Sequence, residues 1–263
     1  MTRKSSRSKN RIWPTPRDER ILRAIATHNY LTGDHIRLLF FRRGSGFAAR
    51  QTVGARLRKL VELGYLTPEI VDGGRGAGPY AYHLTRHGGA LVGLSTKSRR
   101  GRRKAPRHAL AVAGFRVALE LALRTEHGAL EWTGEPELRA DPRSVKPVPD
   151  GIAHWQVAGR HGVLAVELDR GTESFATLFR KLEAYDDWWR TRRYRTTVPG
   201  IGAKPRLVII TTAPRARRLV AHLVGGRRAV GGTVAIAPID AVGAPLDPVW
   251  WRSDTGAIGH LLD

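Results

Sequence analysis

The sequence predicts a mixed α/β protein of two domains: a small helical domain that ends in a β-hairpin, and a larger α/β domain with a mixed sheet. With 263 residues the chain is long enough for two ordinary domains, and an apolar content of 41% is enough for their cores. Residues 1–110 contain 24 Lys and Arg against 6 Asp and Glu, a net of +18, whereas the remaining residues contain 21 against 17, a net of +4. Helical periodicity dominates the first part, and strands alternate with helices in the second. These contrasts predict two domains with different functions.

The formal net charge of +22 predicts a polyanionic partner, most simply double-stranded DNA. RNA binding by the basic N-terminal half is an open alternative. The chain contains no cysteine, which excludes disulfides and thiolate chemistry. No apolar run approaches the roughly 18–20 residues that span a membrane, and the basic residues 1–14 lack the apolar core of a secretory signal. We therefore expect a cytoplasmic protein with no membrane partner, beginning with a disordered basic arm over 1–14.

Residues 15–94 have the pattern of a winged helix-turn-helix, which is three short helices followed by a hairpin. Thr15 precedes a proline and is placed to cap the first helix. Thr32 can cap the second helix, and Gly64 can end the third in the left-handed conformation. Residues 65–71 and 80–85 then read as two strands joined by a glycine-rich turn.

In such a domain the third helix enters the major groove of DNA and the hairpin follows the backbone. The side chains expected to face the groove are Arg50, Gln51 and Arg58. The expected phosphate contacts, which position a protein without reading sequence, are Arg42, Arg43 and Arg75. The alternative is a winged helix that contacts protein, in which these arginines form a solvated face.

A basic segment at 95–107 is predicted to link this domain to an α/β domain over 108–263. It adds salt-sensitive phosphate affinity or only separates the two domains. The predicted elements of the second domain are a helix at 108–125, a candidate edge strand at 130–138, strands at 151–157 and 162–168, a helix at 172–192, a strand at 205–212, a helix at 214–223 and a last strand at 232–239.

Three carboxylates surround the predicted hairpin within the segment VPDGIAHWQVAGRHGVLAVELDRGTES. Glu167 and Asp169 are two residues apart and so share one face of a strand. Asp150 joins that face if the turn centres between Arg160 and His161, whereas a slip of one residue would turn it away. Clustered carboxylates repel one another unless a cation neutralises them, and Mg²⁺ or Mn²⁺ prefers such oxygen ligands. The sequence therefore predicts a divalent metal site.

The hairpin resembles that of the PD-(D/E)xK nuclease superfamily, in which an Asp is followed by a Glu or Asp and then, two residues later, by a Lys. Here Pro149-Asp150 matches the first element and Glu167 the second, while Asp169 stands where the lysine is expected. Some members take the lysine from the following helix, and Lys181 could supply it. The resemblance implies catalytic roles for Asp150, Glu167, Asp169 and Lys181, with the three carboxylates as metal ligands.

A longer string of motifs resembles the replication-relaxation family of bacterial plasmids and mobile elements. These motifs are RHALAVAGFRVALELAL, VPDG, VELDRGTES and FRKLEAY, together with the winged helix. In that family the E-x-D-R-G-T-E stretch is itself characteristic, which offers a second interpretation of Asp169. The resemblance implies a restriction-endonuclease-like α/β domain and a role in DNA replication or mobilisation.

Two functions follow as hypotheses. The first is a DNA endonuclease or nickase that uses Mg²⁺ or Mn²⁺, in which the metal polarises a phosphodiester and Lys181 stabilises the developing charge. The second is a non-catalytic replication or transcription regulator, whose nuclease-like domain contacts DNA or forms a homodimer and whose carboxylates pair with arginines. The first requires Lys181 to reach Asp150 and Glu167. His108 is expected to be a capping or linker residue, and Tyr185 is expected to pack.

Overall fold

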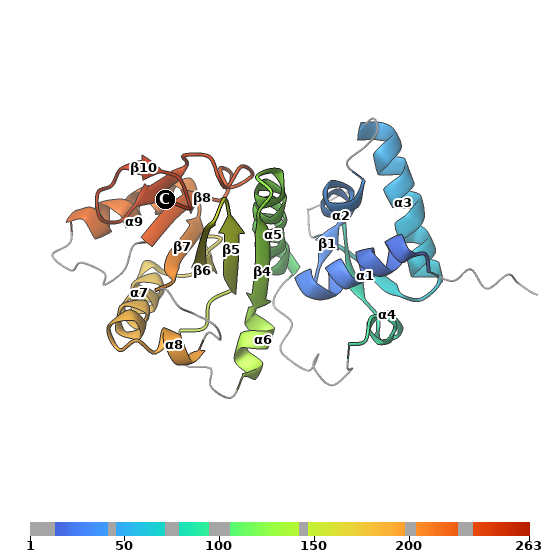
Figure 1. Ribbon diagram of the computed structural model, residues 1–263, viewed down its shortest axis with the longest axis horizontal. Coiled ribbons are helices and arrows are strands. Elements are labelled where there is room, and N and C mark those ends of the chain that lie inside the picture. The colour runs from blue at the N-terminus through green and yellow to red at the C-terminus, as the bar shows by residue number, and fades with distance from the viewer. Residues whose placement is uncertain are drawn as a thin grey trace, which may run out of the picture. The chain divides into compact units, whose positions relative to one another are not determined.

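The computed structural model describes residues 14–41, 46–71, 79–94, 106–141, 147–197, 204–225 and 234–263. The chain divides into two compact units (Figure 1). The first contains the described residues 14–70 and 79–94, and the second contains 106–263. Most of the predicted arm at 1–14 and linker at 95–107 lies outside the described residues. No helix in the described part of the chain is long and apolar enough to cross a membrane.

The first unit contains helices and a small antiparallel sheet. Its elements in order are α1 (Pro16–His28), β1 (Leu31–Thr32), α2 (Gly33–Phe40), α3 (Gly46–Glu62), β2 (Leu66–Ile70), β3 (Tyr80–Leu84) and α4 (Arg86–Leu91). The sheet order is β1-β3-β2, and β2 pairs with β3 in an antiparallel register. The short strand β1 was not predicted. The glycine-rich turn between β2 and β3 lies outside the described residues.

Local sequence signals begin and end the helices of this unit as predicted. The Thr15 hydroxyl accepts a hydrogen bond from the Asp18 N–H, and the Asp18 carboxylate accepts one from the Thr15 N–H, which forms a capping box. Thr32 caps α2 in the same manner. Gly64 follows α3 with a φ of 74°, a conformation that side chains with a Cβ rarely adopt.

An ion pair ties α3 to the start of α1. The Arg56 guanidinium donates to the Asp18 carboxylate and to the Thr15 hydroxyl, and Asp18 is only 1% exposed. Burial raises the pKa of Asp18, but hydrogen bonds from Arg56 and Thr15 outweigh it and lower this pKa below its ordinary value. Around the pair lies an apolar core to which α1, α2 and α3 contribute Ile21, Leu22, Ile25, Ile36, Val53, Leu57 and Leu60.

The second unit is built on a seven-stranded mixed sheet of order β10-β9-β8-β7-β6-β5-β4. The neighbouring strands β6, β7 and β8 are parallel, and the other pairs are antiparallel. Its elements are α5 (Pro106–Thr125), β4 (Ala129–Gly134), α6 (Glu135–Ala140), β5 (Gly151–Val157), β6 (Arg160–Leu168), α7 (Phe175–Arg190), α8 (Tyr194–Thr197), β7 (Arg206–Thr211), α9 (Ala213–Gly225), β8 (Val234–Pro238), β9 (Trp250–Arg252) and β10 (Ile258–Gly259).

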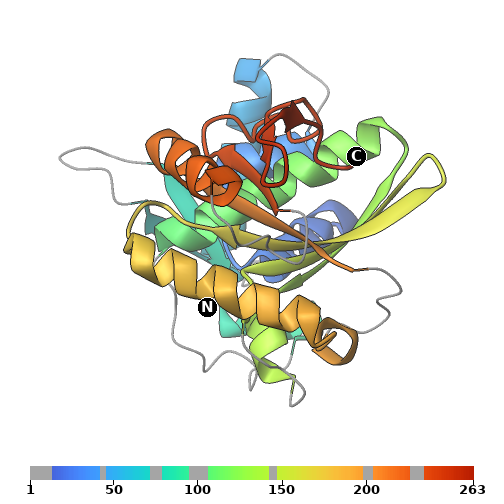
Figure 2. The ribbon, with the colours of Figure 1, turned by 90° about the vertical axis from the view of Figure 1, so that its left-hand side faces the viewer.

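Helices cover both faces of this sheet (Figure 2). Alternate residues of β6 point to opposite faces because side chains alternate along a strand. Val163 and Ala165 belong to the core beneath α7 and α9, and Leu164 and Val166 belong to the core beneath α5. Glu167 follows the odd-numbered set and therefore lies on the face covered by α7.

Two predicted boundaries in this unit are wrong. The edge strand expected at 130–138 ends at Gly134, and the residues EPELRA form α6, because Pro136 near the start of the helix cannot continue a strand ladder. The strand expected to be the last is β8, and the short strands β9 and β10 follow it. The predicted helix at 214–223 and buried strand at 205–212 correspond to α9 and β7.

Candidate functional site

A two-residue turn fixes the register of the β5–β6 hairpin. Ala158 and Gly159 have φ values of 48° and 74°, as a type I′ turn requires. The predicted turn centre, two residues further along, is wrong. An even shift leaves each strand residue on its predicted face. The observed register ends with Gly151 opposite Val166, and Asp150 and Glu167 adjoin this pair on their two strands.

A glycine beside Asp150 makes room for the indole ring of Trp132 on the edge strand β4. A Cβ placed on Gly151 would lie 2.1 Å from Cζ2 of Trp132, so no larger residue fits beneath the indole ring. Gly151 pairs with Gly134 at the end of β4, and the Glu135 N–H donates to the Asp150 carbonyl over 3.2 Å. The backbone at Asp150 is therefore held from both sides.

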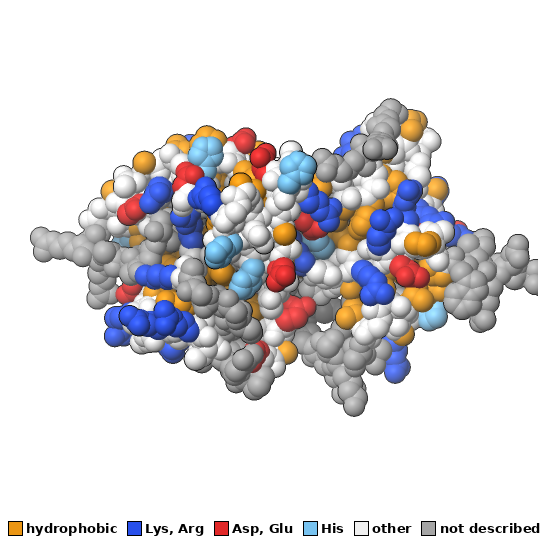
Figure 3. Space-filling view, viewed as in Figure 1, with side chains coloured by type: hydrophobic (Ala, Val, Ile, Leu, Met, Phe, Trp, Pro, Cys, Tyr) orange, Lys and Arg blue, Asp and Glu red, His pale blue; other side chains and the backbone are white. Residues whose placement is uncertain are grey.

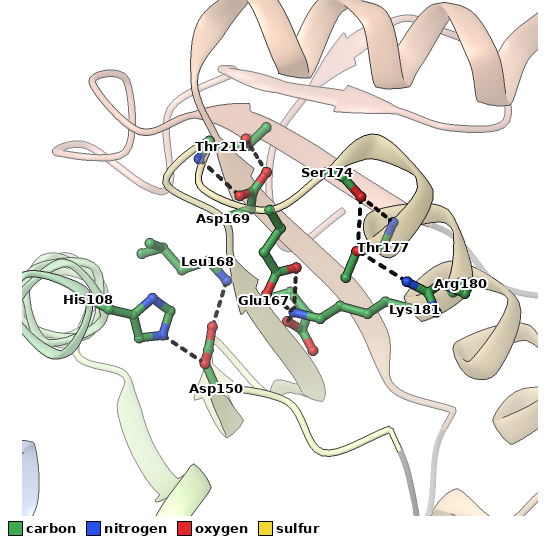
Figure 4. A network of polar contacts seen from close by, with 12 residues as sticks. His108, Asp150, Glu167, Leu168, Asp169, Ser174, Thr177, Arg180, Lys181 and Thr211 are labelled. Atoms are coloured by element: carbon green, nitrogen blue, oxygen red, sulfur yellow. Dashed lines mark hydrogen bonds and ion pairs between the residues drawn. The ribbon is translucent and has the colours of Figure 1, made fainter. Parts of the chain in front are cut away.

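Asp150 is 8% exposed, and both of its carboxylate oxygens accept hydrogen bonds (Figure 4). Oδ2 accepts from the Leu168 N–H over 2.9 Å, and Oδ1 lies 2.9 Å from Nε2 of His108 on α5. The Asp150 N–H donates to the carbonyl of Val166, the residue opposite Gly151. Asp150 thus joins the end of the hairpin to α5.

Glu167 is 6% exposed and lies between β6 and α7. Its Oε1 accepts a 2.7 Å hydrogen bond from the Tyr185 hydroxyl, and its Oε2 accepts a 3.2 Å bond from Nζ of Lys181. Burial and the nearby Asp150 carboxylate raise the pKa of Glu167 to about 7, although Lys181 and Tyr185 favour the charged form. Near neutral pH this side chain is therefore divided between its protonated and ionised forms.

Lys181 reaches the carboxylate site from the following helix. The Ser174 hydroxyl caps α7 by accepting from the Thr177 N–H over 3.1 Å, and Lys181 lies on the second turn of that helix. Its Nζ also contacts Glu173 at 3.1 Å. Burial lowers the pKa of Lys181, but Glu167 and Glu173 outweigh it and raise this pKa above its ordinary value, so the side chain is cationic.

Asp169 lies past the end of β6 and has different partners (Figure 4). Its Oδ2 accepts from the Thr211 hydroxyl over 3.0 Å and from Nε of Arg215 over 2.7 Å, and its Oδ1 accepts from the Gly171 N–H over 2.9 Å. Arg215 belongs to α9, whereas Glu167 contacts α7. The structure therefore brings Asp150, Glu167 and Lys181 together and directs Asp169 to a separate ion pair.

Asp150 and Glu167 are the two residues of this cluster that could hold a divalent ion. Among the described residues, no three His, Cys, Asp or Glu side chains form a group that could hold a metal ion. Mg²⁺ commonly binds one or two carboxylates and keeps several waters or substrate phosphate oxygens as its other ligands. Two buried carboxylates, one of which raises the pKa of the other, would fit that pattern, because a divalent cation would relieve their repulsion.

Sequence reasoning missed two residues of this site. His108 is 42 positions before Asp150, and no local pattern connects the two. Tyr185, expected only to pack, donates to Glu167. A signal for Tyr185 was present, because it lies four residues after Lys181 and hence on the same face of α7.

The predicted DNA-contacting residues that the structure describes lie on α3. Arg50, Gln51 and Arg58 are all exposed. The Arg50 Nε lies 3.7 Å from the Asp34 carboxylate, and both side chains are more than 60% exposed, so water weakens this pair. The predicted phosphate contacts Arg42, Arg43 and Arg75 lie outside the described residues.

The fold and this site together define a mixed α/β protein with a carboxylate–lysine cluster at the end of a β-hairpin. The family model described as Replication-relaxation matches residues 22–201, which is more than half of the chain. The protein belongs to the replication-relaxation family, and this membership suggests a role in DNA processing. No curated protein matches the sequence.

Two solved structures of the restriction endonuclease FokI, one of them bound to DNA, resemble parts of the chain. Each alignment has 12% identity and covers 86% of this chain and 43% of the FokI chain, with TM-scores of 0.31 for the DNA complex and 0.33 for the other structure. This chain thus corresponds to less than half the length of FokI, and similarity at this level says nothing about activity.

Proposed function

We propose that the protein is a metal-dependent DNA endonuclease or nickase that acts in the replication or mobilisation of plasmids or other mobile elements. The observation that carries the proposal is the contact between Lys181 and Glu167, because it joins a cation to a carboxylate pair of the kind that binds Mg²⁺ or Mn²⁺. A bound divalent ion can polarise a phosphoryl oxygen and lower the pKa of a water, which is the chemistry that phosphodiester hydrolysis needs.

Each residue of the site has a distinct role in this proposal. Asp150 and Glu167 would hold the metal, which when bound polarises the phosphodiester and acidifies a water. Lys181 would stabilise the charge that develops on the phosphate, for which its cationic form is suited. Tyr185 orients Glu167 through its hydroxyl, and His108 orients Asp150.

Basic side chains around this site offer a path for the DNA backbone. Lys and Arg side chains gather over α7 and α8 (Figure 3). Exposed residues of this group include Arg180, Arg190 and Arg195, and Arg180 directly precedes Lys181. Such arginines contact phosphates without reading sequence. We infer that sequence recognition belongs to the first unit, which we interpret as a winged helix-turn-helix with α3 as the recognition helix.

Conversion of supercoiled plasmid to nicked or linear forms tests the proposal. Wild type, Asp150→Asn, Glu167→Gln and Lys181→Met are compared in Mg²⁺, Mn²⁺ and EDTA, on plasmids with and without a replication origin from a related mobile element. We expect metal-dependent cleavage by wild type and at least a hundredfold loss in each variant. Glu183→Gln is the matched control, because Glu183 is an exposed carboxylate on the same helix.

Metal binding is measured independently of cleavage. Millimolar Mg²⁺ should raise the melting temperature of wild type at pH 8, since a ligand that binds only the folded state stabilises it. Asp150→Asn and Glu167→Gln should not respond, and Glu183→Gln should respond as wild type does. If wild type neither cuts nor responds to either metal, the carboxylate pair is not an active site.

A non-catalytic regulator is the second candidate. The observation that favours it is that the chain itself supplies partners for all three predicted carboxylates: His108 for Asp150, Lys181 for Glu167 and Arg215 for Asp169. In that case the second unit would contact DNA or form a dimer. Unchanged DNA binding by Lys181→Met, with no cleavage by wild type in either metal, would support this candidate.

A further inference from the structure

The outward face of α3 has a composition that the fold does not require. Phe47, Gln51, Gly54 and Arg58 follow one another at spacings of four, three and four, which puts them on one stripe of the helix. The buried residues Ala49, Val53, Leu57 and Leu60 occupy the opposite face. The stripe thus carries an aromatic ring, an amide, a gap and a guanidinium.

Phe47 is the most exposed large apolar side chain among the described residues, at 72%. It lies in the first turn of α3, the end of a recognition helix that contacts base edges. Exposure of a full aromatic ring to water has no benefit for folding, because burying such a ring is favourable. Its position therefore points to an apolar partner surface outside the unit.

Gly54 is a second, independent observation. A Cβ placed on it would meet nothing within 4 Å, and its φ is not in the left-handed region. Neither packing nor backbone conformation therefore requires glycine here, and glycine is among the poorest residues for a helix interior. A helix position without a side chain does allow another molecule to approach the backbone closely.

The charge of α3 specifies the class of that molecule. Its first turn contains no acidic residue, so no side chain of that turn offsets the positive end of the helix dipole. The one acidic residue of α3 is Glu62, at its last position. Arg50 and Arg58 are exposed on either side of the stripe's centre. A surface that combines positive charge with an apolar ring fits the major groove, where phosphates flank base edges and thymine presents a methyl group.

We propose that the stripe of Phe47, Gln51, Gly54 and Arg58 reads base pairs in the major groove of DNA, with the Phe47 ring in contact with the 5-methyl group of a thymine. Gly54 lets the helix lie close to the groove, and Gln51, one turn from Phe47, is within reach of a neighbouring adenine. The partner is duplex DNA and not RNA, because uracil lacks the methyl group and the major groove of A-form RNA is too narrow for side chains to read. This inference rests on the proposed DNA-binding role of the first unit.

The experiment selects binding sites from a random duplex library with the full-length protein in EDTA. Wild type, Phe47→Ala and Ile258→Ala are used in parallel; Ile258 is also an exposed apolar residue, at 57%, but lies in the second unit. We expect wild type and Ile258→Ala to select a motif that contains a thymine. Phe47→Ala should show no preference for that thymine. Replacing that thymine with deoxyuridine should weaken wild-type binding about fourfold, the value of one buried methyl group, and should not affect Phe47→Ala.

Gly54→Ala provides a test that misfolding cannot explain. Alanine favours the helix, so the melting temperature of the first unit should rise by about 4 °C. Binding to the selected site should nevertheless weaken at least tenfold, because the new methyl group holds the helix away from the groove. A more stable variant with unchanged affinity for the site would contradict close approach at Gly54.

The remaining outcomes separate the inference from the proposed function. If wild type selects a motif and Phe47→Ala selects the same one, base reading by Phe47 is refuted and DNA binding stands. If wild type binds duplex DNA without sequence preference, base reading by Phe47 is likewise refuted and DNA binding stands. If wild type binds no duplex DNA at all, the proposed DNA-binding role fails and this inference fails with it.

Discussion

Replacing Glu167 with glutamine tests the electrostatics of the carboxylate pair, because glutamine keeps the shape of the side chain and removes its charge. In the folded protein the pKa of Glu167 is about 7, against an ordinary value of 4.5. Between these two pH values the folded state keeps a proton that the unfolded chain has released. The folded state then binds more protons, so its stability falls as pH rises through this window.

The size of the effect follows from the two pKa values. One pKa unit corresponds to about 1.4 kcal/mol, so ionising Glu167 in the folded state costs about 3 kcal/mol by pH 8. Glu167→Gln avoids that cost. We expect its free energy of unfolding, minus that of wild type, to rise by about 3 kcal/mol between pH 4.5 and pH 8 in EDTA.

Urea unfolding followed by tryptophan fluorescence measures this difference. Of the seven tryptophans, only Trp13 precedes residue 106, so the signal reports mainly on the second unit. Glu183→Gln, which changes an exposed carboxylate on the same helix, serves as the control for removing a glutamate charge from this unit. A constant difference for Glu167→Gln would refute the reasoning, since it would mean that burial and Asp150 do not raise the pKa of Glu167.

Three further predictions concern the framework of the two units, and urea unfolding measures each of them. Gly151→Ala should lower the free energy of unfolding by about 1–3 kcal/mol, since the added methyl group overlaps the Trp132 ring. Asp18→Asn should destabilise the first unit at pH 7 by about 3 kcal/mol because it leaves Arg56 without its carboxylate. The loss should shrink as pH falls below 3.8, because the lowered pKa of Asp18 stabilises the folded state only above that range. Trp188→Ala should cost about 3–5 kcal/mol, since Trp188 is 1% exposed in the core beneath α7, and a cost below 1 kcal/mol would contradict that packing.

The side-chain alternation of the hairpin could be predicted from sequence, although the turn could not. The expected and observed turn centres differ by an even number of residues, so each residue of β5 and β6 keeps its predicted face in both registers. Ala158-Gly159 is a weak turn signal compared with Asn-Gly or Asp-Gly, because alanine rarely adopts positive φ. The prediction of a carboxylate pair therefore depended only on whether the shift was even or odd. It held although the predicted position of the turn was wrong.

The partners of Asp169 and Asp150 could not be predicted, because they come from segments that are far away in the sequence. Asp169 could turn toward Lys181 on α7 or toward an arginine on α9, and nothing in VELDRGTES decides between them. In the structure it pairs with Arg215, 46 residues later. His108 reaches Asp150 only because α5 covers the other face of the sheet. Both pairings follow from how the layers stack, and local spacing carries no information about that.

The unequal electrostatics of the three carboxylates distinguish the two candidate functions. Asp169 has an arginine and a hydroxyl of its own, as expected of a structural ion pair. Burial and the Asp150 carboxylate instead raise the pKa of Glu167, and Lys181 does not fully offset this effect. A glutamine at position 167 would keep the hydrogen bond from α7 and avoid the cost of ionising Glu167, so a purely structural role gives no reason for two acids here. In the proposed nuclease a divalent cation would give one, because it would turn the repulsion between the two carboxylates into shared ligation, and for this reason we propose a metal-dependent site rather than an inert one.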